Sequence, residues 1–221
     1  MRKQLLLAFL TFTAVLPVPA ALFSAGNVSG SGTALNLGIP DGTYPAGVSS
    51  TIGVSGLGGS LSSVTVTLNI AGGFNGDLYG YLSYNGTLVT LLNHVGTGSG
   101  DAFQSAAGYS TSGFNSITLA DGGAGGNIHD VASPVSGVSY GPDGGTLASF
   151  NSMNPNGTWT LFLADNATPN QSTLEGWSLD ITAVPEPVNT AMAIFGLVGI
   201  SAGATRCYLA RRRRQTPPAT N

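Results

Sequence analysis

Apolar and polar residues alternate along several short segments of the chain, which is the pattern of β-strands with one buried face. The clearest case is segment 61–70, and segments 157–164 and 174–183 repeat it with Trp159 and Trp177 at apolar positions. In segment 61–70 the apolar positions are Val64, Val66, Leu68 and Ile70. We expect one core between two sheets, containing Val66, Leu68, Trp159, Leu161, Trp177 and Leu179.

A β-hairpin is predicted by two further segments, 77–83 and 87–92, because the turn between them contains Asn85-Gly86. Shorter strand candidates are segments 50–54 and 114–119. No part of residues 21–184 keeps a helical period over three turns. The pattern therefore predicts an all-β fold, an antiparallel β-sandwich.

A long stretch, 96–146, is rich in Gly, Ser and Asp and holds only one of these strand candidates. Connections of this length without their own secondary structure are uncommon in compact domains. We interpret the stretch either as an ordered, ligand-bearing connection or as a partly mobile one.

The C-terminal region has the order of a membrane anchor. Residues 188–205 carry no charged side chain, and four consecutive arginines, Arg211, Arg212, Arg213 and Arg214, follow. An apolar run of this kind predicts a transmembrane helix over 188–210, and the arginine cluster predicts a basic cytoplasmic tail over 211–221.

The N-terminal region has the order of a secretory signal peptide. Two basic residues precede an apolar run over 5–16, and a small-residue cleavage site ends at Ala20. We predict a signal peptide over 1–20, followed by a polar lead over 21–35. The region between the two sorting segments, 21–184, is then expected outside the inner membrane.

This exported region is strongly acidic. All seven Lys and Arg residues of the chain lie outside 4–205, whereas 21–184 holds nine Asp and Glu residues, a formal side-chain charge of −9. Nucleic acid is bound largely through Lys and Arg on its phosphates, so it is excluded as a partner. Counter-charges must come from solvent cations. The single cysteine, Cys207, lies in the predicted helix, so the exported region has no disulfide.

Calcium is the cofactor that this composition favours, because it prefers carboxylate, amide and main-chain oxygens in irregular loops. Asp77 stands at the start of a predicted strand, and Asp165 follows the predicted strand 157–164. If these two strands are neighbours, both carboxylates lie at one end of the sandwich. We take Asp77 and Asp165 as candidate calcium ligands; the alternative is that Asp165 only starts a turn.

Catalysis is poorly supported by the residues. Ser139 lies in a G-x-S-x-G match, but a nucleophile elbow stands between a buried strand and a helix, whereas Pro134 and Pro142 flank this one. The only candidate bases of the imidazole type are His94 and His129. We therefore predict no catalytic residues.

Two weaker interpretations remain open. His129 and Asp130, with Asp121, could suggest a transition-metal site. Trp159 and Trp177 could form a platform on which sugars stack, although alternation favours burial of both.

The end of the chain resembles a known sorting signal. Val184, Pro185, Glu186 and Pro187 precede the apolar run and the arginines, an order similar to the PEP-CTERM signal of Gram-negative bacteria. The resemblance implies recognition of this motif by an exosortase, which processes such tails. It also implies transient anchoring in the inner membrane, followed by surface attachment or release.

Residues 36–183 resemble the P domain (Homo B domain) of subtilisin-type proprotein convertases. The matching motifs run in order from Ile39-Pro40-Asp41 through segment 64–70, Gly76-Asp77-Leu78, Asn85-Gly86-Thr87 and Gly157-Thr158-Trp159 to Trp177-Ser178-Leu179. The resemblance implies a jelly-roll β-sandwich and points to calcium, since some P domains depend on it. The catalytic residues of the convertases belong to a separate domain that this chain does not match.

Taken with the charge and the sorting signals, this resemblance predicts a non-catalytic exported module with a binding or structural role in the envelope or extracellular matrix. Its expected partners are the exosortase, the membrane and an exopolysaccharide or envelope protein. The alternative is a secreted hydrolase or a carbohydrate-binding protein.

Overall fold

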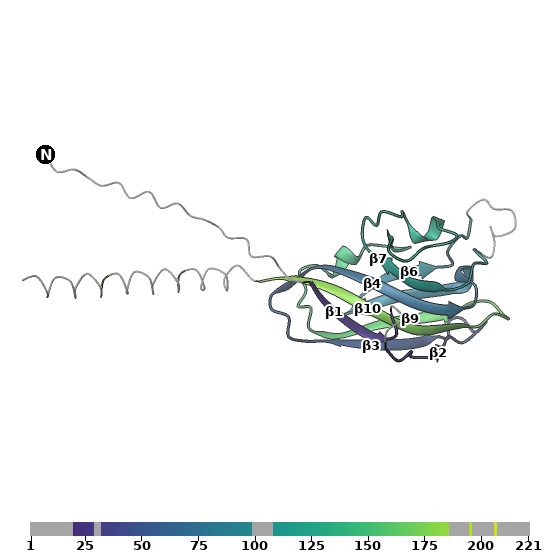
Figure 1. Ribbon diagram of the computed structural model, residues 1–221, viewed down its shortest axis with the longest axis horizontal. Coiled ribbons are helices and arrows are strands. Elements are labelled where there is room, and N and C mark those ends of the chain that lie inside the picture. The colour runs from purple at the N-terminus through teal and green to yellow at the C-terminus, as the bar shows by residue number, and fades with distance from the viewer. Residues whose placement is uncertain (1–19, 29–31, 99–107, 186–194, 196–205, 207–221) are drawn as a thin grey trace, which may run out of the picture.

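The chain folds into two facing β-sheets in the computed structural model, which describes residues 20–28, 32–98 and 108–185 together with Phe195 and Arg206 (Figure 1). The first sheet has the order β1–β10–β4–β7–β8, and β2 also pairs with β10. Its strands are β1 (Ala20–Gly26), β2 (Leu37–Gly38), β4 (Ser60–Gly72), β7 (Phe114–Leu119), β8 (Ser139–Tyr140) and β10 (Ser172–Val184).

The second sheet has the order β3–β9–β5–β6. Its strands are β3 (Val48–Val54), β5 (Leu78–Tyr84), β6 (Thr87–Asn93) and β9 (Gly157–Asp165). All strand pairs are antiparallel except β7 with β8. Three short 3-10 helices lie in the connections: η1 (Asn75–Asp77), η2 (Ile128–Asp130) and η3 (Leu147–Phe150). The predicted all-β sandwich is therefore confirmed at the level of two packed sheets.

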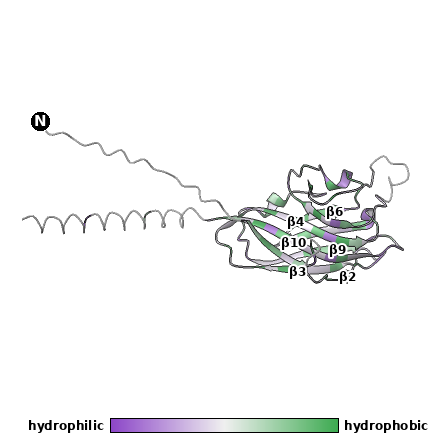
Figure 2. Cartoon of the chain, in the orientation of Figure 1, coloured by the Kyte–Doolittle hydropathy of each residue, from purple (hydrophilic) through white to green (hydrophobic). Residues whose placement is uncertain are grey.

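The expected core is confirmed, since Val66, Leu68, Trp159, Leu161, Trp177 and Leu179 are all buried between the sheets. Apolar residues recur along the strands of both sheets (Figure 2). Each indole N–H has a partner: Trp159 donates to the Pro155 carbonyl over 3.1 Å, and Trp177 donates to Ser50 Oγ over 2.9 Å. Because neither indole is exposed, the interpretation of these tryptophans as a sugar platform was wrong.

The predicted hairpin is also confirmed. β5 and β6 are joined at Asn85 and Gly86, whose φ angles of 47° and 80° both fall in the left-handed region. A two-residue loop of this conformation matches the twist of the flanking strands, and Asn-Gly is the sequence that tolerates it best. The strand at Phe114–Leu119 has the predicted bounds.

The largest difference from the sequence prediction is at the N-terminal end of the domain. Segment 21–35 was expected to be a polar lead, but β1 occupies most of its first part and pairs with β10 from Ala20 opposite Thr182 to Gly26 opposite Gly176. Its sequence contains mostly small residues, so its alternation is weak, yet Phe23 packs against the core. The folded unit therefore begins near Ala20, not at residue 36.

The stretch 96–146 is also more structured than its composition suggested. Its described part contains η2 and β8 in addition to β7. The Gly141 carbonyl accepts a hydrogen bond from the Ile128 amide, and the Gly141 amide donates to the Gly126 carbonyl. These two bonds hold the segments around residues 126–128 and 141 together. Part of the stretch, 99–107, lies outside the described residues.

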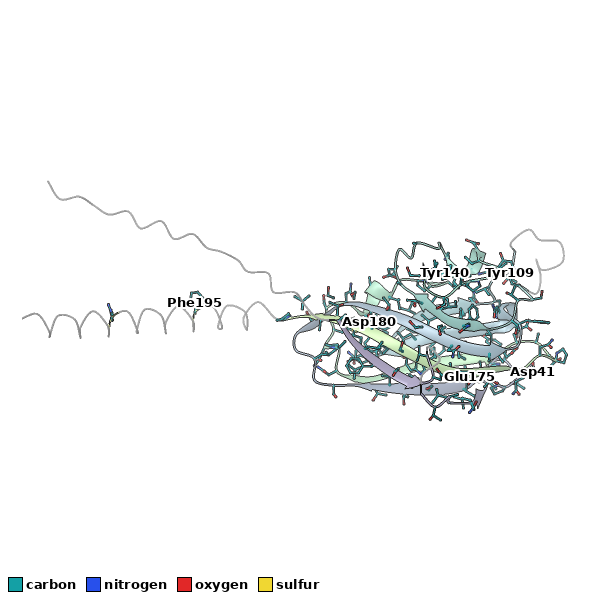
Figure 3. All side chains as sticks on the ribbon, viewed as in Figure 1. Asp41, Tyr109, Tyr140, Glu175, Asp180 and Phe195 are labelled. Carbon is teal, nitrogen blue, oxygen red and sulfur yellow. The ribbon has the colours of Figure 1, made fainter. Side chains whose placement is uncertain are left out.

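The two ends of the sandwich are formed by different segments. β1 begins and β10 ends at the same end, since Ala20 pairs with Thr182 and Val184 pairs with Ser60. We call this the proximal end. The opposite or distal end is formed by the loops 40–46, 73–77 and 166–171. Figure 3 shows Asp41 at this end, far from the point where the chain leaves β10.

Most residues of the sorting segments lie outside the described part of the chain. This applies to the signal peptide before Ala20, to Glu186 and Pro187, and to Arg211 through Arg214. Within the described residues, no helix is both long and apolar enough for a membrane crossing.

Candidate functional site

The structure brings Asp77 and Asp165 together at the distal end, as their predicted positions required. β5 and β9 are neighbours, and Leu78 pairs directly with Asp165. The Asn166 amide donates to the main-chain carbonyl of Asp77 over 2.9 Å. The two carboxylates therefore extend from adjacent strand ends.

A third carboxylate, that of Asp41, was missed by the sequence reasoning. The motif Pro40-Asp41-Gly42 indicated only a turn, but the turn lies against the loop after Asp165: a Cβ built on Gly42 would meet the Thr168 side chain at 2.4 Å. Burial is the main cause that raises the pKa of Asp77 and of Asp165, and the charge of Asp41 adds to the rise in both. The signal that could have identified it is the acid's place in a matched motif of the P-domain resemblance.

Burial sets Asp77 and Asp165 apart from the other acids, whereas Asp41 is half-buried. Asp77 is 8% exposed and Asp165 is fully buried. Asp165 Oδ1 accepts a bond from the Ala167 amide over 3.3 Å, whereas Asp165 Oδ2 and Asp41 Oδ1 are buried without a hydrogen bond. Buried carboxylate oxygens that lack a donor are costly, because desolvation is not compensated.

These costs are visible as raised pKa values. Burial first, then the charges of Asp165 and Asp41, raise the pKa of Asp77 to about 6. Burial also raises the pKa of Asp165. The Ala167 amide and Ser172 partly offset that rise, although neither Ser172 Oγ nor Asp165 Oδ2 has a hydrogen bond of normal geometry. Residues 21–184 contain no Lys or Arg, so no such side chain of the domain neutralises these carboxylates.

The helix η1 positions Asp77 and adds a further unpaired oxygen. Asn75 Nδ2 donates to the Gly113 carbonyl over 3.1 Å, and this bond fixes which end of the amide is the oxygen. Asn75 Oδ1 is then buried without a partner. The preceding turn requires Gly73, which has a φ of 61° and whose hypothetical Cβ would lie 1.8 Å from Ser172 Oγ. Asp41, Asn75, Asp77 and Asp165 all lie in the loops and strand ends of the distal end, and we call these four residues the distal oxygen cluster.

The distal oxygen cluster fits a hard divalent cation in the chemistry of its donors. It offers carboxylate and amide oxygens, and several of them lack any other partner. In the described part of the chain, no three Asp, Glu, His or Cys side chains converge closely enough to hold a metal by themselves. A calcium ion would therefore need amide and main-chain oxygens in addition to the carboxylates.

The structure supports neither a nucleophile elbow at Ser139 nor a transition-metal site that includes Asp121. Ser139 lies in the two-residue strand β8, and an isolated bridge at Gly141 follows it where an elbow would have a helix. Both carboxylate oxygens of Asp121 accept amide bonds from η3, at Leu147 over 2.8 Å and Ala148 over 2.7 Å. Asp121 is thereby committed to capping η3.

His129 makes the only salt bridge among the described residues. Its Nδ1 lies 2.9 Å from Asp143 Oδ2, and its Nε2 lies 2.8 Å from the Thr97 carbonyl. Both ring nitrogens face acceptors, so the doubly protonated ring suits the site. The bond to Asp143 is the main cause that raises the pKa of His129 above 6.5, and Asp130 adds a smaller contribution.

This geometry predicts a pH dependence of stability. A raised histidine pKa in the folded state means that the contribution is fully present below the unfolded value and is lost as the pH rises through the folded value. We expect the melting temperature to fall as the pH rises above 6.5, and we expect this part of the fall to disappear in His129→Gln. An unchanged pH profile in that variant would show that the pair contributes nothing.

No family model matches the chain, and no curated protein matches it. Six chains of solved structures resemble it at a distance, among them the following two. One is the serine protease of Aeromonas sobria in complex with its chaperone, with 16% identity and a TM-score of 0.45. The other is the serine protease of Aeromonas sobria, with 14% identity and a TM-score of 0.45. The matches cover 79% and 78% of this chain, and the chain spans 28% of each protease chain.

Proposed function

We propose that the protein is a non-catalytic exported module, similar to a P domain, that is sorted through a PEP-CTERM signal and binds a cation and a further ligand at its distal end. The observation that carries this proposal is that the sorting segments and the distal oxygen cluster belong to opposite ends of the sandwich. The sorting segments adjoin the proximal end, and the distal oxygen cluster lies at the opposite end.

The proximal end is compatible with both sorting steps. Ala20, at the predicted cleavage site, pairs with Thr182, so the chain enters beside the strand from which it leaves. β10 ends at Val184, and Pro185 follows without a spacer. A Cβ on Gly59 would lie 2.0 Å from the Val184 carbonyl, so the start of the motif packs closely on the domain. An exosortase would therefore act on a motif whose first two residues, Val184 and Pro185, pack against the folded sandwich.

The distal end is the part of an anchored domain that would face away from the membrane. In such an orientation the distal oxygen cluster is presented to the surroundings of the cell, which suits a role in the envelope or the extracellular matrix. Calcium is the cofactor that we propose for it.

The sorting proposal is tested by Glu186→Ala in a host that has an exosortase. The wild-type chain is expected to lose its arginine tail, whereas the variant is expected to remain unprocessed and membrane-retained. Intact-mass measurement distinguishes the two forms.

A matched control is Asp180→Ala, which removes an exposed acid from β10 near the same end. It is expected to be processed normally. Equal processing of wild type and Glu186→Ala would contradict recognition of the motif and leave a plain transmembrane anchor.

A further inference from the structure

Two exposed aromatic rings belong to the loops that carry members of the distal oxygen cluster. Tyr44, in the same turn as Asp41, is 49% exposed, and Phe74, next to the helix that carries Asp77, is 37% exposed. Tyr44 packs edge-on against Tyr79, with ring centroids 5.8 Å apart. The loops that supply the carboxylates therefore also present two rings to solvent.

The ring at Tyr44 is held in place by the same elements that hold the carboxylates. It contacts His94 with centroids 6.4 Å apart. The His94 amide donates to the Leu78 carbonyl over 2.9 Å, and His94 Nδ1 donates to the Gly76 carbonyl over 3.2 Å. Since Gly76 and Leu78 flank Asp77, the ring and the carboxylate share one scaffold.

A continuous aromatic row supports Tyr79 from the other side. Tyr79 contacts Tyr81 at 6.2 Å, and Tyr81 stacks on Phe162 at 4.9 Å. These rings alternate with the buried residues of β5 and β9, so they lie on the outer face of the second sheet. Their faces are largely used against each other, which leaves Tyr44 as the best exposed ring of the group.

We propose that the distal end is a cation-dependent carbohydrate-binding site. A divalent cation held by Asp77, Asp165 and nearby amide and main-chain oxygens would also bind oxygen atoms of a polysaccharide, while one of the sugar rings of that polysaccharide packs on Tyr44. This inference rests on the proposed function, because it requires the distal oxygen cluster to hold a cation.

The chemistry favours a carbohydrate as the occupant. Calcium takes about 6–8 oxygen ligands in proteins, and the distal oxygen cluster provides only part of that number. The remaining coordination positions suit hydroxyl or carboxylate oxygens of a sugar. An aromatic ring beside polar groups is the kind of lining that fixes a small polar ligand. Residues 21–184 have no Lys or Arg, so a bound cation would supply the positive charge that attracts an anionic polysaccharide.

A protein partner is favoured less by the same observations. Stable protein interfaces bury on the order of 800 Å² on each partner around an apolar centre. The exposed large apolar residues of the described chain come instead from many different segments. They are Leu22, Leu35, Tyr44, Phe74, Leu88, Val135 and Val184 in the sandwich, and Phe195 beyond it.

The test is binding of the purified full chain to three probes, dextran, mannan and alginate, measured by calorimetry with saturating calcium and again with excess chelator. Dextran and mannan offer hydroxyl groups alone, and alginate offers carboxylates as well. We expect at least one probe to bind with calcium, and to lose about tenfold or more of its affinity with chelator or in Tyr44→Ala. Failure of all three probes to bind overturns the inference.

A matched control is Leu88→Ala, which removes an exposed apolar side chain (51% exposed) from β6 of the same sheet, near the hairpin turn at the other end. It is expected to bind like wild type. Binding that survives both chelator and Tyr44→Ala would place the carbohydrate elsewhere. Calcium-induced self-association that Tyr44→Ala abolishes would favour a second copy of the chain and also overturns the inference.

The failure of this inference can be told apart from the failure of the proposed function. Tyr44→Ala keeps all members of the distal oxygen cluster, so its stabilisation by calcium should equal that of wild type. Stabilisation by calcium without carbohydrate binding rejects only the carbohydrate site. Absence of both rejects the cation site as well.

Discussion

Replacing Trp159 by alanine is expected to lower the free energy of unfolding by about 3–5 kcal/mol. The indole is fully buried, stacks on Tyr84 with ring centroids 4.0 Å apart and packs edge-on against Phe150 at 5.1 Å. Truncation removes these contacts and leaves a cavity that β-strands on both sides cannot close. Typical domains are stable by only about 5–15 kcal/mol, so the variant should be close to unfolding.

The same loss is expected for Trp177→Ala, which also removes the hydrogen bond to Ser50 Oγ. Urea unfolding of the full chain measures both variants. Leu22→Ala is the control, because Leu22 is 71% exposed and its removal should cost less than about 0.5 kcal/mol. Losses below about 1 kcal/mol at both tryptophans would contradict the core described here.

Calcium is expected to produce the second large effect. A ligand that binds only the folded state stabilises it by about 2.7 kcal/mol at a hundred times the dissociation constant. For this chain we expect millimolar calcium to raise the melting temperature by several degrees more than sodium does at equal ionic strength. Sodium screens the repulsion among acids but occupies no site.

Two variants separate a site from general screening. Asp77→Asn combined with Asp165→Asn keeps the shape of the distal oxygen cluster and should abolish the calcium increment. Asp180→Asn removes the charge of an exposed acid near the proximal end and should keep the increment. Equal stabilisation by calcium, magnesium and sodium would contradict a calcium site.

Much of the sandwich could be predicted from the sequence, because its central strands are long and have one buried face. Alternation located β4, β9 and β10, and the Asn85-Gly86 turn joined β5 to β6. The prediction that Asp77 and Asp165 meet depended on one further condition, that β5 and β9 are neighbours, and the observed pairing of Leu78 with Asp165 satisfies it.

The remaining features depend on long-range packing that local patterns do not report. β1 has small residues and little alternation, and it forms because β10 offers a free edge. Asp41 joins the distal oxygen cluster only because its turn lies against Thr168, more than a hundred residues away along the chain. Likewise, nothing near Tyr44 in the sequence indicates that its ring meets Tyr79 and His94.

The most direct test of the central claim is a crystal structure of the chain grown with calcium. We predict a calcium ion at the distal end, with carboxylate oxygens of Asp77 and Asp165 at about 2.3–2.6 Å and amide or main-chain oxygens among the remaining ligands. Crystals grown at saturating calcium that show no ion between these residues, or an ion bound only elsewhere, would contradict the account.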